Sequence, residues 1–260
     1  MSAGGVPIEA LEPLVRNPAT AGIFMDFDGT LSEIVSEPDE AIPLAGAVEV
    51  LDELASVYGR VGILSGRPVS FLEQFFPRSV LLAGLYGLET VYGGERRDHP
   101  LGGAWREVID DVAAIARARG PAGMKVESKG LSLTLHYRTR PRLAPKVRAF
   151  AEQQALRSGL ECRPARMSYE LHPPIPADKG TALLELAEGL EAVCFIGDDL
   201  GDLHAFDALD TLAKEGQYTL RVAVHSNEEA TELIDRADAV VDSPKAVLEL
   251  AEYLRDSARR

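Results

Sequence analysis

Ile23-Phe24-Met25-Asp26-Phe27-Asp28-Gly29-Thr30-Leu31 is the stretch from which both the fold and the chemistry are inferred. A short apolar run ends in two aspartates that are one residue apart, and a Gly-Thr pair follows at once. Alternate residues of a strand point the same way, so Asp26 and Asp28 leave the strand end on one side. Two carboxylates this close repel each other unless they share a cation or a proton. With the amides of a glycine turn and the Thr30 hydroxyl beside them, they suit a divalent cation and a phosphate.

The bulk composition is that of an ordinary globular protein. The chain has 260 residues, of which 46% are hydrophobic and 26% are charged, and this length predicts one large or two modest domains. Lys and Arg number 27 against 41 Asp and Glu, so the net charge is −14. Such a charge disfavours non-specific binding to nucleic acid and to anionic membranes. Any bound phosphate therefore needs a locally positive pocket or a metal ion.

The two cysteines and the N-terminal segment predict a location. Cys162 and Cys194 lie in apolar, strand-like runs without the spacing of a metal site, so we expect buried free thiols in a reducing compartment. Residues 1–18 have neither the basic nor the apolar region of a signal peptide. No apolar run approaches the ~18 residues that a membrane span needs. We therefore expect a cytoplasmic protein.

Helices and buried strands alternate at both ends of the chain. In the first part of the chain the predicted order is a strand ending at Asp26, helix 43–55, strand 61–64, helix 69–76 and strand 80–83. From residue 178 the predicted order is a helix through 183–187, strand 192–196, helix 201–213, strand 220–224, a short helix, strand 239–241 and helix 245–255. Near-continuous apolar strands that alternate with helices indicate a parallel, doubly wound sheet.

The middle of the chain has a different pattern. Helix 102–119 precedes strands 124–129 and 131–138, and helix 143–158 precedes strands 160–164 and 167–172. This αββαββ order with hairpins indicates an inserted domain. We therefore predict an α/β protein with a doubly wound, mostly parallel, Rossmann-like core at 1–100 and 176–260, and an inserted α+β cap domain at 101–175.

Four loops carry the candidate chemistry, each at the carboxyl end of a predicted core strand or the start of a core helix, where ligands bind in open α/β sheets. They are Asp26-x-Asp28, Ser65-Gly66-Arg67, Lys179 after Asp178, and Gly197-Asp198-Asp199-x-x-Asp202. Each alone has a structural alternative: a turn for the first two, a surface lysine for the third, and a helix cap at Asp199 for the fourth. Their coincidence favours a phosphate site with Mg²⁺ between two acidic strand ends.

At these four loops the sequence resembles the haloacid dehalogenase-type phosphatases, with all four motifs of that superfamily in order. The resemblance implies that Asp26 is the nucleophile that forms an aspartyl-phosphate. It implies that Asp28 is the general acid and then the general base, and that Ser65 and Lys179 hold the phosphoryl group. The implied magnesium ligands are Asp26, the Asp28 backbone carbonyl and Asp198, with Asp199 and Asp202 acting directly or through water. Magnesium would shield the carboxylate nucleophile from a dianionic substrate.

The predicted sheet of the cap domain has two unlike faces. Between 131 and 138, and again between 167 and 172, apolar residues at odd positions alternate with polar ones at even positions. We expect the apolar face to pack on the two helices of this domain. We expect the polar face to close over the core site and to hydrogen-bond a polyol or sugar. The alternative is an ordinary solvated face.

A narrower resemblance covers nearly the whole chain. The motifs of trehalose-6-phosphate phosphatases are matched at 26–31, Gly84-Leu85-Tyr86-Gly87-Leu88-Glu89, Glu127-Ser128-Lys129-Gly130, His136-Tyr137-Arg138 and 197–199. The likeness implies that Glu127, Lys129 and Glu170 contact the disaccharide and that Arg67 helps on the core side. Thr30 and Gly66, which offer a hydroxyl and an amide, complete the expected substrate-binding set.

The chain departs from that family at three places. Tyr86 stands where the family usually has His, and His172-Pro173 stands where it usually has Arg-Pro. Gly201-Asp202-Leu203 replaces the usual Thr-Asp-Glu, which keeps the aspartate but loses a pair that contacts the cap. These differences leave the predicted chemistry intact and leave the identity of the sugar open.

The sequence therefore predicts a Mg²⁺-dependent phosphatase that converts trehalose 6-phosphate to trehalose and phosphate. A phosphatase of another sugar or polyol phosphate, such as sucrose phosphate or mannosyl- or glucosyl-3-phosphoglycerate, is the alternative. A non-catalytic phosphate-sensing module is a distant one, because it predicts the loss of Asp26 or Asp28 and both are present. We expect a monomer whose partner is a small sugar phosphate, with no nucleic acid and no membrane.

Overall fold

The structure is a computed structural model that describes residues 2–35, 37–165, 167–225 and 230–259. Within this part the chain divides into two units, one of Met1–Arg97 with Ala177–Arg260 and one of Asp98–Pro176. The divisions fall at 97/98 and 176/177, where the sequence predicted 100/101 and 175/176. We call the first unit the core unit and the second the inserted unit.

The core unit is built on one mostly parallel sheet. Among the described residues it has eight strands in the order β14-β13-β12-β3-β4-β5-β6-β7. Their bounds are β3 (Ala21–Met25), β4 (Arg60–Leu64), β5 (Leu81–Gly84), β6 (Glu89–Tyr92), β7 (Glu95–Asp98), β12 (Ala192–Gly197), β13 (Tyr218–Val224) and β14 (Ala239–Val241). Neighbours from β14 to β5 are parallel, and β5 pairs with β6 antiparallel.

The strand order reverses between β3 and β12. The chain adds β4 and β5 on one side of β3, and later adds β12, β13 and β14 on the other side. β3 and β12 pair in parallel from Ala21 opposite Ala192 to Met25 opposite Ile196. The backbone N–H of Asp26 continues this ladder by donating to the Ile196 carbonyl at 2.9 Å. Ligands of doubly wound sheets bind where the strand order reverses, so the fold brings the first and fourth motifs together there.

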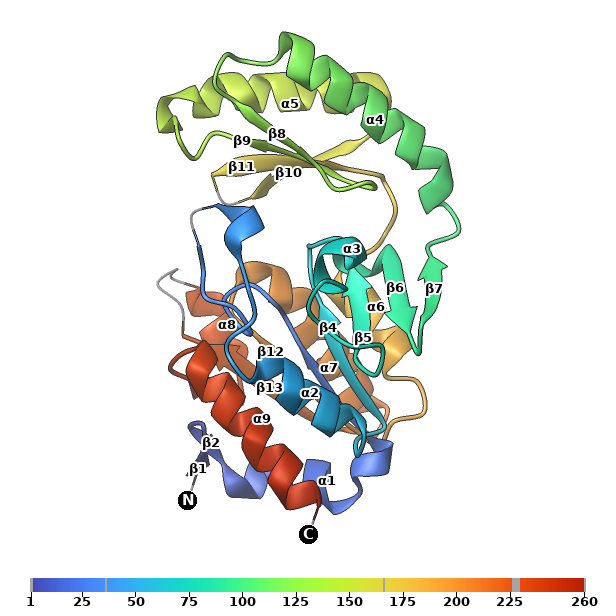
Figure 1. Cartoon of the computed structure of the whole chain (residues 1–260), viewed down its shortest axis with the longest axis vertical. Helices are drawn as coiled ribbons and strands as arrows, with labels where there is room; N and C mark the ends of the chain where they lie inside the picture. The colour runs from blue at the N-terminus through green and yellow to red at the C-terminus, as the bar shows by residue number, and fades with distance from the viewer. Residues whose placement is uncertain (1, 36, 166, 226–229, 260) are drawn as a thin grey trace. The chain divides into compact units, whose positions relative to one another are not determined.

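Helices pack on both faces of this sheet, as the sequence predicted. The helices are α1 (Ile8–Arg16), α2 (Ala47–Ala55), α3 (Val69–Leu72), α6 (Lys179–Leu186), α7 (Leu203–Lys214), α8 (Thr231–Arg236) and α9 (Pro244–Ala258). Along β3, Ile23 and Met25 pack with α1, α2, α3 and α9, whereas Phe24 packs with α6, α7 and α8. Figure 1 shows α2 and α9 side by side on one face, with α7 behind the sheet.

Several predicted bounds were wrong. Residues 43–46 are not helical, and the N–H of Leu44 instead donates to the Leu31 carbonyl at 2.8 Å, so α2 begins at Ala47. α3 ends at Leu72 instead of 76, and the turns that follow it are irregular. The sequence prediction also missed α1 and the strands β6 and β7, which a two-residue Gly93-Gly94 turn joins.

The inserted unit has the predicted αββαββ order. Its elements are α4 (Gly102–Arg119), β8 (Lys125–Ser128), β9 (Leu133–His136), α5 (Ala144–Ser158), β10 (Glu161–Ala165) and β11 (Ser168–His172). Within the described residues its sheet has the order β10-β11-β9-β8 with every neighbouring pair antiparallel. Leu133, Leu135 and Leu171 are fully buried and form one apolar cluster with α4 and α5. The prediction for the apolar face is therefore confirmed.

Two smaller expectations concern the cysteines and membrane-spanning segments. Cys162 and Cys194 are both free thiols, but only Cys194 is buried, whereas Cys162 is half-buried on β10. None of the described helices combines the length and the apolar character that crossing a membrane requires.

Candidate active site

Asp26 lies at the carboxyl end of β3 with only 4% of its surface exposed. Burial raises the pKa of its carboxyl group well above the ordinary value, because the charged form loses its hydration. The ammonium group of Lys179 opposes this rise, and the nearby carboxylates of Asp202, Asp199 and Asp198 add to it. A nucleophilic role requires the carboxylate form, so this site needs positive charge beyond that of the lysine.

Lys179 is the first residue of α6 and is 3% exposed. Asp178 caps this helix by accepting from the Thr181 N–H at 2.7 Å, which fixes where the lysine emerges. Its Nζ lies 3.0 Å from Asp26 Oδ1 and donates to Asp202 Oδ1 at 2.6 Å. Burial alone would lower the pKa of Lys179, but the carboxylates of Asp202 and Asp26 outweigh it and raise that pKa well above its ordinary value. The lysine therefore stays charged between two aspartates.

Three buried aspartates form a candidate metal site at the ends of β3 and β12. Carboxylate oxygens of Asp26, Asp198 and Asp202 all lie within 4.8 Å of one another. Gly29 lies against this cluster, since a Cβ atom on it would be 2.1 Å from Asp198 Oδ2, so the loop after β3 can approach only without a side chain. Three carboxylates and one lysine leave an excess of buried negative charge. The donor set, oxygen atoms only, fits Mg²⁺.

In the acidic loop after β12, Asp202 and Asp199 have different surroundings and hydrogen bonds. Asp202 is fully buried, and its Oδ2 accepts from the backbone N–H groups of Asp198 at 2.9 Å and Asp199 at 3.2 Å. Burial raises the pKa of Asp202 to about 6, although Lys179 lowers it. The side chain of Asp199 is exposed and accepts from the Gly201 N–H at 2.8 Å, as a cap of the following turn. Asp199 is thus near the cluster but outside it.

Ser65 and Thr30 place hydroxyl groups at the same edge of the sheet. Ser65 directly follows β4, is 1% exposed, and its Oγ accepts from the backbone N–H of Arg67 at 3.1 Å. Gly66 lies between these two residues in the turn. Thr30 is fully buried, and its Oγ1 has no hydrogen-bond partner within the described part of the chain. A buried hydroxyl without a partner is costly, so a polar ligand beside Thr30 would satisfy it.

Asp28 and Arg67 form an ion pair that links the first and second motifs. The guanidinium donates from Nε to Asp28 Oδ2 at 2.8 Å and from Nη2 to Oδ1 at 2.6 Å. Arg67 is nearly buried and its guanidinium carbon lies 4.4 Å from the centre of the Phe71 ring, so its position is fixed. Sequence reasoning placed Arg67 near the substrate but missed its pairing with the expected acid/base. No local spacing signals such a pair, because it joins two separate strand ends.

Two of the three predicted sugar contacts of the inserted unit, Glu127 and Glu170, share one face of its sheet. Glu127 on β8 pairs directly with Thr134 on β9, which pairs with Glu170 on β11, so the three form one row across the strands. Glu127 Oε2 lies 2.7 Å from His136 Nε2. Thr134 Oγ1 is buried without a hydrogen-bond partner among the described residues. Lys129 lies beyond β8 in the hairpin turn. Thr134 was signalled only by its alternation with the leucines, whereas His136 was also part of a matched family motif.

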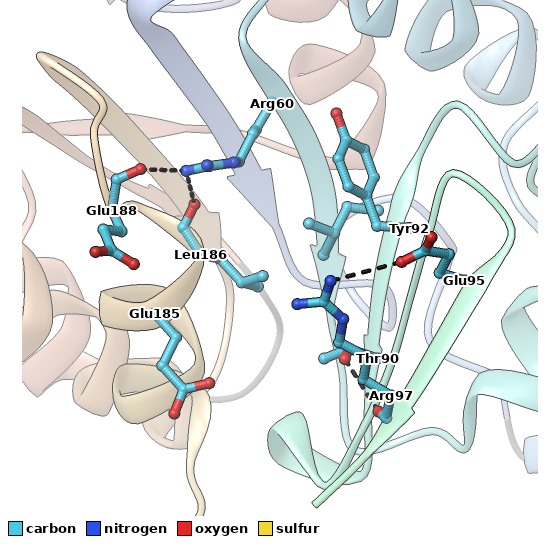
Figure 2. A pocket seen from close by; sticks show the side chains of 9 residues that line it. Arg60, Thr90, Tyr92, Glu95, Arg97, Glu185, Leu186 and Glu188 are labelled. Atoms are coloured by element: carbon cyan, nitrogen blue, oxygen red, sulfur yellow. Dashed lines mark hydrogen bonds and ion pairs between the residues drawn. The ribbon is translucent and has the colours of Figure 1, made fainter.

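A cavity of about 350 Å³ lies elsewhere in the core unit, toward the amino ends of β4 and β5 (Figure 2). It contains none of the predicted site residues. Arg60 on its wall donates from Nη1 to the backbone carbonyls of Leu186 at 2.7 Å and Glu188 at 2.6 Å. Arg60 therefore anchors the far end of the helix that begins with Lys179.

Comparisons with known proteins agree with this geometry. The family model described as trehalose-phosphatase matches residues 24–238. The trehalose-phosphate phosphatase of Mycobacterium ulcerans is 34% identical over 243 residues, which cover 89% of this chain and 60% of that protein. This chain thus spans about 60% of the length of that relative.

Solved structures show the same fold at lower identity. The C-terminal domain of the Candida albicans trehalose-6-phosphate phosphatase is 24% identical with a TM-score of 0.76, and the match covers 98% of each chain. A haloacid dehalogenase-like hydrolase from Bacteroides thetaiotaomicron is 17% identical with a TM-score of 0.61, and the match covers 91% of this chain and 98% of that one. The family match extends over most of the sequence, including Asp26, Lys179 and Asp202. The chain therefore belongs to the trehalose-phosphatase family.

Proposed function

We propose that this chain is a magnesium-dependent phosphatase that hydrolyses trehalose 6-phosphate to trehalose and inorganic phosphate. The observation that carries the proposal is the buried contact of Lys179 with Asp26 and Asp202 at the reversal of the strand order. A buried lysine between two carboxylates suits a site that binds a phosphoryl group beside a carboxylate nucleophile. Membership of the trehalose-phosphatase family supports the substrate.

In the proposed reaction Asp26 attacks the phosphorus atom and the bond from phosphorus to the sugar oxygen breaks. Asp28 donates a proton to the leaving oxygen, so trehalose departs as a neutral alcohol. Asp28 then takes a proton from a water molecule, which attacks the phosphorus and releases inorganic phosphate and the free Asp26 carboxylate. For Asp28 to donate its proton, at least one of its two hydrogen bonds with Arg67 must be given up.

The other residues of the core site position charge around the phosphoryl group. Lys179 and Ser65 hold its oxygens, and Thr30 offers the buried hydroxyl that lacks a partner among the described residues. Asp26 and Asp198 would hold magnesium, together with the Asp28 backbone carbonyl. Asp202 instead orients Lys179 and the loop after β12, since its oxygens accept from Lys179 and from two backbone amides. When bound, the metal ion would neutralise the negative charge that the nucleophile and substrate bring together.

Recognition of the sugar is assigned to the polar row of the inserted unit. Glu127 and Glu170 lie two strands apart, a separation of about 10 Å that matches the span of a disaccharide better than that of a small polyol. Thr134 lies between them with its buried hydroxyl group. Lys129 adds a cation at the hairpin turn. Carboxylates and hydroxyls of this kind suit the many hydroxyl groups of a sugar.

One observation favours a second candidate, a phosphatase of another sugar phosphate. His172 stands where an arginine is usual, and its Nδ1 lies 2.8 Å from the Pro173 carbonyl while Nε2 lies 3.6 Å from Glu161. Burial lowers the pKa of this histidine. The neutral ring therefore takes the place of a permanent cation, which changes what the polar face can bind.

A substrate panel tests the proposal. Release of inorganic phosphate is measured from trehalose 6-phosphate, sucrose 6-phosphate, glucosyl-3-phosphoglycerate and p-nitrophenyl phosphate, each with Mg²⁺ and with a chelator. We expect the highest kcat/KM for trehalose 6-phosphate and no turnover with the chelator. A higher kcat/KM for another sugar phosphate would favour the second candidate, and no turnover of any substrate would refute both.

A further inference from the structure

Two residues next to the candidate site have a strained backbone. Leu85 and Tyr86 have φ values of +49° and +60°, and Gly87 follows with +94°. Residues other than glycine rarely adopt this left-handed conformation, and each instance costs on the order of 1 kcal/mol. Such strain persists only where the surrounding structure enforces it, and it is found most often at functional sites. The Leu85–Glu89 segment, between β5 and β6, therefore calls for a functional explanation.

The strained residues hold the Ser65-Gly66-Arg67 loop. The N–H of Leu85 donates to the Arg67 carbonyl at 2.9 Å, and the N–H of Tyr86 donates to the Ser65 carbonyl at 3.0 Å. The left-handed turn thus directs two successive amides at two carbonyls of the loop that carries the expected phosphate contact. A regular strand would point successive amides in opposite directions.

Glu89 holds the same loop at a third point. It is 3% exposed, and its Oε2 accepts from the backbone N–H of Val69 at 3.1 Å, while its Oε1 lies 3.0 Å from Nη2 of Arg96. Val69 begins α3, and the residue that precedes it, Pro68, provides no side-chain cap. A carboxylate from the start of β6 therefore caps the helix that follows the phosphate loop.

The opposite side of the segment packs on α6. A Cβ atom on Gly87 would lie 2.7 Å from the Cβ of Ala182, one turn after Lys179, so this contact leaves no room for a side chain. The other end of α6 is anchored by Arg60, as Figure 2 shows. The segment therefore fills the space between the loop that carries Ser65 and the helix that carries Lys179.

We propose that Leu85–Glu89 is the positioning element of the phosphate site, which sets the distance between Ser65 and Lys179, and that Glu89 is its principal positioning residue. Glu89 so placed contacts neither the substrate nor the reacting atoms, and it acts through the Val69 amide and the loop before it. The proposal rests on the proposed function, because it assumes that Ser65 and Lys179 hold one phosphoryl group.

The test compares Glu89→Ala and Glu89→Gln with Glu73→Ala. Glu73 is a matched control, since its carboxylate lies 4.0 Å from the same Arg96. Its hydrogen bond to Val69 runs from its own backbone N–H to the Val69 carbonyl at 2.9 Å, which an alanine keeps. Binding of inorganic phosphate in the presence of Mg²⁺ is measured by calorimetry, and kcat and KM are measured for trehalose 6-phosphate and p-nitrophenyl phosphate. We expect Glu89→Ala to weaken phosphate binding and to lower kcat, each by about tenfold or more and equally for both substrates. Glu89→Gln, which retains an acceptor for Val69, should recover most of the loss, and Glu73→Ala should match the wild type.

A second variant, Gly87→Ala, tests the inference independently in case Glu89→Ala does not fold. Gly87→Ala keeps every hydrogen bond of the segment but pushes on α6 and adds strain at a φ of +94°. We expect a lower melting temperature, together with the same joint loss of phosphate binding and kcat measured at a temperature where the variant is fully folded. The inference is overturned if the phosphate affinity and kcat of Glu89→Ala equal those of Glu73→Ala. It is also overturned if kcat falls while phosphate affinity and KM stay constant, because that result indicates only a smaller fraction of folded molecules. If the wild-type chain binds phosphate but turns over no substrate, the proposed function fails while the binding comparison still decides this inference.

Discussion

Arg67 and Asp28 are joined by two parallel hydrogen bonds of 2.8 and 2.6 Å, which connect the loop after β4 to the loop after β3. Such a bidentate pair fixes the plane of a carboxylate as well as its distance. The stacking of the guanidinium on Phe71 restricts the arginine in turn. The proposed general acid and base is thus held by a residue that the sequence assigned to substrate binding.

The first prediction concerns this pair. Arg67→Lys keeps the positive charge but cannot form two parallel hydrogen bonds, so Asp28 loses its fixed orientation. We expect kcat for trehalose 6-phosphate to fall about 10- to 100-fold with a smaller change in KM. Steady-state kinetics measure this, with the exposed Arg16→Lys as control. A kcat equal to that of the control would show that the pair does not position Asp28.

The second prediction concerns Lys179. Lys179→Met leaves the buried carboxylates of Asp26 and Asp202 without their cation. We expect the metal-free protein to lose about 3 kcal/mol or more in its free energy of unfolding, and phosphate release to be abolished. Denaturant titration without magnesium measures the first effect. The double variant Lys179→Met, Asp202→Asn should regain part of the lost stability, and an additive loss would contradict the proposed coupling.

The third prediction follows from the raised pKa values of the acidic cluster. The pKa of Asp202 is about 6 in the folded protein and about 3.9 in an unfolded chain, so the folded state binds the proton more tightly. In the metal-free protein this contribution to stability is complete below about pH 4 and is lost as the pH rises through about 6. The pKa of Asp26 is raised as well and acts in the same direction.

Magnesium held by Asp26 and Asp198 would compete with the proton on Asp26, and its charge would favour the ionised form of the neighbouring Asp202. Its effect should therefore have the opposite pH dependence. We expect the rise in melting temperature on adding Mg²⁺ to be small at pH 5 and to grow as the pH increases through about 6. Melting curves with and without Mg²⁺ from pH 5 to 8 test this. In Asp202→Asn the dependence near pH 6 should weaken, and a pH-independent effect of Mg²⁺ in the wild type would contradict the assignment of the metal site.

The fourth prediction concerns the polar row of the inserted unit. Glu170→Ala and Glu127→Ala should lower kcat/KM for trehalose 6-phosphate by about tenfold or more, because hydrogen bonds to the sugar are lost. The same variants should leave kcat/KM for p-nitrophenyl phosphate within about twofold of the wild type, since that substrate offers no sugar hydroxyls. Glu152→Ala on α5, an exposed carboxylate of the same unit, is the control. Equal losses on both substrates would exclude sugar recognition by this row.

The sequence predicted the elements that apolar patterns mark strongly. α4 was predicted at 102–119 and occupies Gly102–Arg119, because its apolar stripe and terminal glycines define both ends. β7 was missed, because all four residues of Glu95–Asp98 are exposed and carry no apolar pattern. The one sequence signal for this strand is the Gly93-Gly94 turn that precedes it. α2 was predicted too long, because the pairing of Leu44 with Leu31 is a tertiary contact.

The candidate site likewise has residues that the sequence predicts and contacts that it does not. Asp26, Ser65, Lys179 and Asp198 follow strand ends or begin a helix, so sheet topology alone predicts that they meet. The partners of Asp28 and of Asp199 depend on side-chain directions, which the sequence does not encode locally. The role of Glu89 was hidden for another reason. Its carboxylate reaches Val69 only because Leu85 and Tyr86 turn the chain through a left-handed conformation.

The most direct test of the proposed mechanism is the release of inorganic phosphate from trehalose 6-phosphate in the presence of Mg²⁺ by the wild-type chain and by Asp26→Asn. We expect turnover by the wild type and none by the variant, with the variant folded as judged by its melting curve. Turnover by Asp26→Asn at a rate near that of the wild type would contradict the assignment of Asp26 as the nucleophile.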